Sequence, residues 1–350
     1  MRDPGYPIAD LHEDIAYFLQ RGDRDLVRDF DRDIPGRHGD IPKYMRGGVK
    51  LIFSALFPAL ETWDPRLGEI SGKLYGGRAS PRSNIFTGLD NLFEQLKIYY
   101  RLSEEYRRYI EIVYEGRDLE FFDRDDKIRF LISLEGADPL ANPDDLEIVF
   151  RLGVRALGIT WNYDNKYGAS CTSNKDYGLT EAGERLVSLA NKLGVVIDVS
   201  HSSRRTALDV LSISKQPVIA SHSNYHGRKP HRRNIDDEII EGIKRSGGVI
   251  GFTLIRSTIG GSESIDDLIL HILDVWQRFG SDVIAIGSDL FGIETTPEGI
   301  RDAGDLRVII DKLAEKGFGD NDLRKISHEN VLRILRSVSS RWSMKSSAST

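Results

Sequence analysis

Apolar residues along this chain gather in eight short runs, most of them rich in valine and isoleucine. Strands that are covered on both faces of a parallel sheet have this nearly continuous hydrophobic pattern. The predicted strands are 8–15, 50–57, 128–135, 156–161, 195–201, 217–223, 248–254 and 283–290. Amphipathic segments predict helices at 91–114, 143–152, 180–193, 204–213, 236–246, 264–279, 304–316 and 320–337.

The repeated alternation of strand and helix favours a single (β/α)8 TIM barrel of the α/β class. An open doubly wound sheet is the alternative, but it usually carries a glycine-rich phosphate turn after its first strand. Here the first run ends in DLHED at 10–14 instead. We therefore predict one catalytic barrel domain over 1–337 with a long insertion loop at about 58–88, followed by a flexible tail at 338–350.

The composition of the chain indicates which binding partners and which cellular compartment to expect. The 350 residues carry a formal net charge of −6, and mixed acidic and basic residues argue against a nucleic-acid partner. No segment approaches the roughly 18 apolar residues of a membrane span, and no secretory signal is visible. Cys171 is the only cysteine and cannot form an internal disulfide, so a reducing, cytoplasmic location is expected.

Chemistry in these barrels lies at the carboxyl ends of the strands. Five of the predicted strands end in histidine or acidic residues, namely His12 and Asp14, Glu135, His201, His222 and Asp289. Each residue alone has an ordinary structural explanation, such as a helix cap. Glu135 is harder to explain in this way, because it follows an apolar run and a buried carboxylate without partners is costly. Together the six residues predict a metal site.

The number of ligands indicates the type of site. The expected ligands mix nitrogen and oxygen donors and are His12, Asp14, Glu135, His201 and His222. One zinc ion with an open position needs only three, whereas five suit two ions about 3.5 Å apart with Glu135 as the bridge. A water bridging two such ions is deprotonated near neutral pH and serves as the nucleophile. Asp289 is then free to accept its proton and pass it to a leaving amine. Zinc follows from the ligand types, and manganese or cobalt would also serve.

The segment that follows the sixth run carries several basic residues close to the expected site. Most of them belong in a solvated loop, although His226 and His231 are near enough to matter. One arginine turned inward would hold a substrate carboxylate with two parallel hydrogen bonds. The residues alone do not separate Arg232 from Arg233 for this role.

Eight blocks of the chain, in order, resemble the membrane (renal-type) dipeptidases and their soluble bacterial and archaeal relatives. They are DLHED, GGVKLIFSALFP, SLEGADPL, LGVRALGITWN, GLTEAGERLVSLANKLGVVIDVSHSS, PVIASHSNYHGRKPHRRNIDDE, IAIGSDLFG and HENVLRIL. The resemblance implies a barrel with two zinc ions bridged by Glu135 and with Asp289 as the catalytic acid and base. It also implies that Arg233, in the RRN triplet, binds the C-terminal carboxylate of the substrate. Members hydrolyse dipeptides, often with a D-residue at the C-terminal position, and several are homodimers.

One position departs from the family pattern. Animal members carry LTHN at the end of the fourth strand, and that histidine helps to bind substrate near the scissile carbonyl. Here Trp161 takes its place, and an indole offers a single donor, so it either donates one hydrogen bond or walls the pocket. Glu13, between two expected ligands, is predicted to point away from the metals and to tolerate glutamine.

The leading hypothesis is a binuclear zinc dipeptidase. A second is a related activity on the same barrel, such as hydrolysis of an N-acyl amino acid or a lactone. A third is a non-catalytic barrel that keeps its metal for stability or binding, but such a barrel has no use for Asp289 beside the metals.

Overall fold

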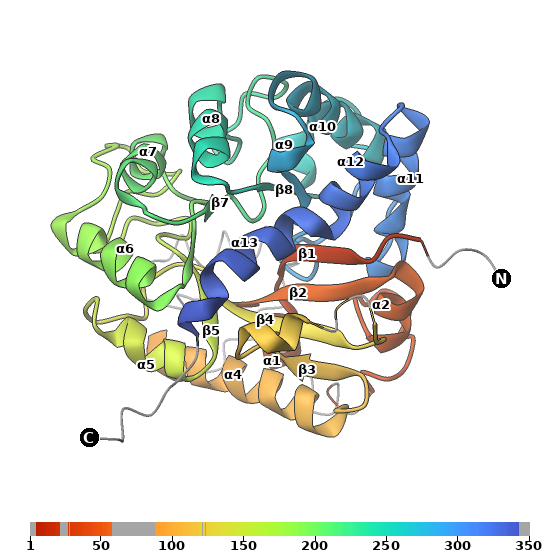
Figure 1. Ribbon diagram of the computed structural model, residues 1–350, viewed down its shortest axis with the longest axis horizontal. Helices are drawn as coiled ribbons and strands as arrows, with labels where there is room; N and C mark the ends of the chain where they lie inside the picture. The colour runs from red at the N-terminus through yellow and green to blue at the C-terminus, as the bar shows by residue number, and fades with distance from the viewer. Residues whose placement is uncertain are drawn as a thin grey trace.

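The computed structural model describes residues 5–21, 27, 29–57, 88–120, 122 and 124–342. The predicted insertion loop lies outside these residues, except for Gly88, which begins a helix. Eight parallel strands of the described chain follow one another in the order β7-β6-β5-β4-β2-β1-β9-β8. A parallel bridge between Ala220 and Ile250 joins the two ends of this order. The sheet therefore closes into the predicted barrel, with helices around it (Figure 1).

Each barrel strand overlaps one predicted run, because its side chains are buried on both faces. The strands are β1 (Ile8–Glu13), β2 (Val49–Leu56), β4 (Ile128–Leu134), β5 (Val154–Gly158), β6 (Val196–Asp198), β7 (Val218–Ile219), β8 (Ile250–Phe252) and β9 (Ile284–Ile286). A further strand, β3 (Ile110–Ile112), pairs with the beginning of β4. The helix predicted over 91–114 is therefore wrong at its end, since the helix stops at Glu105.

Helices alternate with the strands and cover the outside of the barrel (Figure 1). They are α1 (Ile15–Arg21), α2 (Ile41–Gly47), α4 (Gly88–Glu105), α5 (Asp145–Arg151), α6 (Glu181–Leu193), α7 (Arg204–Ile213), α8 (Asp237–Ser246), α9 (Arg256–Ile259), α10 (Ile265–Phe279), α11 (Arg307–Glu315), α12 (Asp320–Arg324) and α13 (Asn330–Val338). Five of them begin at side-chain caps that accept hydrogen bonds from the first turn, at Asp40, Thr180, Ser203, Asp236 and Ser264.

The C-terminal helix covers the amino ends of the barrel strands. A π-helical turn at Lys325–Glu329 joins α12 to α13, and α13 lies across the strands in Figure 1. The Asn330 amide donates to Ser281 O and Ile284 O at the start of β9. The Trp342 side chain is fully buried, and its indole donates to Gly194 O just before β6. The predicted start of the tail at 338 is therefore too early.

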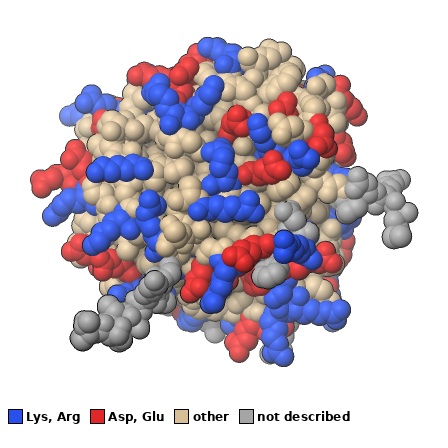
Figure 2. All heavy atoms as spheres, viewed as in Figure 1, with Lys and Arg blue, Asp and Glu red and all other residues tan. Residues whose placement is uncertain are grey.

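Because one end of the barrel is covered in this way, the carboxyl ends of the strands are left to form the site. The face of the molecule in Figure 2 carries basic and acidic side chains interspersed, without a continuous patch of either sign.

Candidate metal centre

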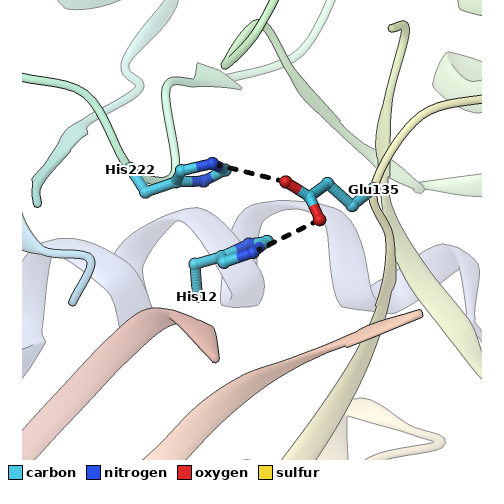
Figure 3. A group of neighbouring side chains, drawn as sticks. All are labelled: His12, Glu135 and His222. Carbon is cyan, nitrogen blue, oxygen red and sulfur yellow. Dashed lines mark ion pairs between the residues drawn. The ribbon is translucent and has the colours of Figure 1, made fainter. Parts of the chain in front are cut away.

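The barrel brings the six predicted chain positions together at the carboxyl ends of its strands. They are His12, Asp14, Glu135, His201, His222 and Asp289, and each is at most 7% exposed. In Figure 3, His12 and His222 point toward the carboxylate of Glu135, and one carboxylate oxygen faces each ring. A group of residues spread over the whole chain therefore converges on one small volume.

The carboxylate of Glu135 separates two groups of nitrogen atoms. Its Oε1 lies 3.0 Å from His201 Nε2 and 3.5 Å from His222 Nε2, whereas its Oε2 lies 3.6 Å from His12 Nε2. Asp14 Oδ2 is 3.4 Å from His12 Nε2 on the second side. Glu135 thus lies between His201 and His222 on one side and His12 and Asp14 on the other.

The ring of His201 is held so that its Nε2 lone pair faces the site. Its Nδ1 lies 2.7 Å from Asn162 Oδ1, an oxygen that only accepts, so Nδ1 carries the proton. Arg233 Nη2 donates to His201 Nε2 over 2.9 Å. His222 Nε2 lies only 2.8 Å from the same nitrogen. A cation at this place would bind the lone pairs of both Nε2 atoms.

Unpartnered polar atoms support the fit of a metal. His12 Nε2, Asp14 Oδ1 and Glu135 Oε2 are buried and have no hydrogen-bond partner among the described residues, and such atoms are costly in a folded protein. Imidazole nitrogens and carboxylate oxygens are common ligands of zinc. Ligand atoms within 4.8 Å of one another form two overlapping groups, one of His12, Glu135 and His222 and the other of His12, Asp14 and Asp289. These residues therefore fit divalent cations.

Two of the histidines are set up as neutral ligands. Burial lowers the pKa of His201 well below its usual value, and the positive charges of Arg233 and His12 lower it further. Burial and the same two charges have this effect on the pKa of His222. Because a metal binds the neutral imidazole, both rings are ready to bind at neutral pH.

In the acidic part of the cluster the pKa values are raised instead of lowered. Burial raises the pKa of Glu135 well above its usual value. Burial, with a contribution from Asp14, also raises the pKa of Asp289 to about 7. Burial alone would lower the pKa of His12. The negative charges of Glu135, Asp14 and Asp289 have the larger combined effect and raise this pKa to about 10. The carboxylates therefore favour a positive charge at this place, which a metal ion would supply.

The backbone is unusual at two of the site residues. His201 and Asp289 have φ values of 64° and 63°, in the left-handed region that non-glycine residues rarely adopt. Hydrogen bonds from Cys171 N to His201 O and from Asp289 N to His12 O hold the two segments. Such conformations persist only where the surroundings support them, and they gather at functional sites.

A cavity of about 430 Å³ opens above the cluster. Arg233 and Trp161 both line it, as the sequence predicts for substrate-binding residues. The Arg233 guanidinium also donates to His222 O and forms no ion pair with any described residue, so it is available for a carboxylate. Trp161 packs edge-to-face on Phe57, with 4.8 Å between the ring centres, and forms an apolar wall.

Sequence reasoning missed the residues that hold the ligands in place. Asn162 binds His201, and the carboxylate of Asp198 accepts the Ser221 hydroxyl next to His222. Glu13, which was predicted to point away from the metals, is fully buried and accepts a hydrogen bond from Tyr44 of α2. One feature of the sequence could have pointed to such supporting residues. Asp10 and Asp198 stand two and three residues before His12 and His201, respectively.

A barrel with histidines and carboxylates converging at the carboxyl ends of its strands defines a metal-dependent hydrolase of the TIM-barrel type. Residues 5–348 match the family described as membrane dipeptidase, peptidase family M19. The chain therefore belongs to this family and is a metallodipeptidase of the M19 class. In the described part of the chain, no helix combines the length and the apolar character needed to cross a membrane.

Individual relatives agree over nearly the whole chain. Dipeptidase verJ of Clonostachys rogersoniana is 29% identical over 95% of this chain and 84% of its own length. An uncharacterized dipeptidase of Schizosaccharomyces pombe is 30% identical over 93% of this chain and 79% of its own. A Rhodobacter sphaeroides metallopeptidase, solved with a phosphinate mimic of the dipeptide L-Ala-D-Ala, is similar in fold with a TM-score of 0.84, 24% identity, and coverage of 95% and 99% of the two chains.

Proposed function

We propose that this protein hydrolyses the peptide bond of dipeptides with two zinc ions. His12 and Asp14 would hold one ion, His201 and His222 the other, and Glu135 would bind both. The observation that carries the proposal is the convergence of imidazole nitrogens on both oxygens of the Glu135 carboxylate, with His201 Nε2 at Oε1 and the unpartnered His12 Nε2 at Oε2. Five ligands of this kind exceed the needs of one catalytic zinc ion. Manganese or cobalt in place of zinc would leave the assignment of the ligands unchanged.

Held by these five residues, divalent cations would lower the pKa of a bound water and so would supply a nucleophile near neutral pH. Asp289 lines the same cavity, and its Oδ1 lies 3.8 Å from His12 Nε2. It would take the proton of the attacking water and deliver it to the leaving amine nitrogen. Both transfers need a carboxylate that is not itself required as a ligand. With Asp14 and Glu135 assigned as ligands, Asp289 would fill this role.

Arg233 would bind the C-terminal carboxylate of the dipeptide and so place the peptide bond over the ligands. Its guanidinium lies 2.9 Å from His201 Nε2, so a carboxylate bound to it would lie beside the proposed ligands. The wall of Trp161 and Phe57 would exclude water from the substrate. Dipeptides with a C-terminal D-residue belong to the proposal, and the L-Ala-D-Ala mimic held by the Rhodobacter relative supports their inclusion.

A substrate panel on protein of measured metal content tests this function. The panel holds dipeptides with L- and D-residues at the second position, the matching N-acyl amino acids and a lactone. Arg233→Ala is compared with Arg228→Ala, a matched control in the same loop whose guanidinium pairs with Asp274. Losing one partner of a buried, hydrogen-bonded charge pair costs about 2–5 kcal/mol. We expect kcat/KM for dipeptides to fall at least about 30-fold in the first variant and to change little in the second.

The outcomes separate the hypotheses. If the Arg233→Ala protein turned over the best substrate at an unchanged rate, Arg233 would not bind a substrate carboxylate. The proposal that this substrate is a dipeptide would then fail. Faster turnover of an N-acyl amino acid or a lactone than of any dipeptide would assign the alternative activity. A homodimer in the cytoplasm is part of the same proposal, and sedimentation of the purified protein together with cell fractionation checks it.

A further inference from the structure

Asp198 ends strand β6 just below the proposed metal ligands and uses both of its oxygens to hold neighbouring backbone and side chain. Its Oδ1 accepts from Ser200 N over 2.8 Å and from Ser221 N over 2.9 Å. Its Oδ2 accepts the hydroxyl proton of Ser221 in a short hydrogen bond. Asp198 is 8% exposed and forms no ion pair among the residues that the structure describes. The carboxylate is therefore dedicated to Ser221 and its surroundings.

The direction of these hydrogen bonds determines which nitrogen of His222 carries a proton. A hydroxyl has one proton, and Ser221 gives it to the carboxylate. Ser221 Oγ lies 2.7 Å from His222 Nδ1 and can then only accept from it. The Ser200 hydroxyl, at 3.3 Å, is a more distant partner of Ser221. The chain of Asp198, Ser221 and His222 thus places the ring proton on Nδ1 and leaves the Nε2 lone pair facing the site.

The site itself favours the opposite tautomer when no metal is bound. A proton on His222 Nε2 would find an acceptor in Glu135 Oε1 at 3.5 Å. The other neighbour of this nitrogen, His201 Nε2 at 2.8 Å, already accepts from Arg233. That tautomer cannot bind a metal, because the nitrogen that faces the site has no free lone pair. Something outside the cluster must therefore favour the tautomer that can bind.

We propose that Asp198, acting through Ser221, holds His222 in the Nδ1-protonated tautomer and so keeps its Nε2 available to a metal ion. Asp198 is then a positioning residue, since it acts on the metal only through His222. The inference rests on the proposed metal site, but it does not depend on the identity of the substrate. It is an instance of the rule that partners of the ligands tune metal affinity.

The opposite side of the barrel supplies a matched control. Asp10, on β1, accepts from His12 N and Ser288 N on Oδ1 and from the Ser288 hydroxyl on Oδ2. This is the same pattern as at Asp198, with Ser288 immediately before Asp289. Here the serine precedes a carboxylate, so there is no imidazole tautomer to set. Asp10→Asn therefore makes the same chemical change as Asp198→Asn but should leave the tautomer of His222 unchanged.

The decisive variants are Asp198→Asn and Ser221→Ala. An asparagine amide that donates to Ser221 Oγ turns the hydroxyl toward His222 Nδ1 and puts the ring proton on Nε2. Ser221→Ala only removes the preference. We expect zinc affinity, measured by competition with a chelator, to fall about 10–100-fold in Asp198→Asn and less in Ser221→Ala. The double variant should bind zinc better than Asp198→Asn alone, because the misdirected hydroxyl is gone.

Nitrogen–proton correlation NMR of metal-free protein with labelled histidine reads the tautomer directly. We expect His222 to be protonated on Nδ1 in the parent protein and in Asp10→Asn, and on Nε2 in Asp198→Asn. A purely structural role for Asp198 predicts no rescue by the second substitution and no change of tautomer, and either finding overturns the inference. If the parent protein hydrolysed no dipeptide of the substrate panel, that result would count against the proposed function and not against this inference.

Discussion

In the metal-free protein, the charge of Asp289 should make stability depend on pH, and the isosteric substitution Asp289→Asn tests this. Burial, with the neighbouring Asp14 carboxylate, raises its pKa from 3.8 to about 7. The folded chain therefore keeps this proton up to about pH 7, whereas the unfolded chain releases it near pH 4. Asp289→Asn has nearly the same shape and no charge, so it removes the difference between the two states.

The sign and size of the effect follow from proton linkage. Between these pH values the folded state binds more protons than the unfolded state, so stability falls as the pH rises. About three pH units at about 1.4 kcal/mol per unit give about 4 kcal/mol. The nearby charge of His12, 3.8 Å away, adjusts with Asp289 and makes this value an upper limit. We expect metal-free Asp289→Asn to match the parent near pH 4 and to be about 2–4 kcal/mol more stable at pH 8.

Urea unfolding followed by tryptophan fluorescence, with a chelator present, measures this difference at pH 5, 6, 7 and 8. Asp311→Asn is the control, because its side chain is 64% exposed and its charge is solvated. A difference that does not grow with pH, or an Asp289→Asn protein that is less stable at pH 8, would refute the reasoning. With zinc restored, the same variant should keep its metal and lose dipeptide turnover.

Three further predictions follow from individual contacts. Burial raises the pKa of Glu13 well above its usual value, and Tyr44 donates to it, so Glu13→Gln should keep turnover within about twofold, whereas His12→Ala should lose metal in elemental analysis. Trp342→Ala should cost about 3–5 kcal/mol in urea unfolding, and Trp342→Phe about 1 kcal/mol, because it loses only the bond to Gly194. Chelation should lower the Tm and zinc should restore it; an unchanged Tm would count against the metal site.

The barrel could be predicted from sequence because its strands are buried on both faces and read as short apolar runs. The segments that were missed lack this signal. β3 has three residues, and its Ile110 and Ile112 continue the apolar positions of the preceding helix closely enough to be read as part of it. Trp342 lies in a serine-rich end of the chain, and only tertiary contacts, such as the hydrogen bond to Gly194 O, show that its side chain is packed.

The site positions could be predicted because strand ends are readable along the chain and meet at one end of a closed barrel. The supporting contacts could not, because they join strands that are adjacent only in the closed sheet. Asp10 reaches Ser288 across 278 residues, between strands β1 and β9. No local pattern indicates which serine such an aspartate will bind.

The same contacts explain how the strained strand ends persist. The left-handed conformation of Asp289 costs of the order of 1–3 kcal/mol, and Ser288, the residue before it, is bound at both its backbone N–H and its hydroxyl by Asp10. On the other side, Asp198 binds Ser200 N immediately before the left-handed His201. Each buried aspartate therefore stabilises an unfavourable backbone turn that aims a side chain into the site. Neither aspartate lines the cavity above the cluster, so each acts on the site only through the residues that it holds.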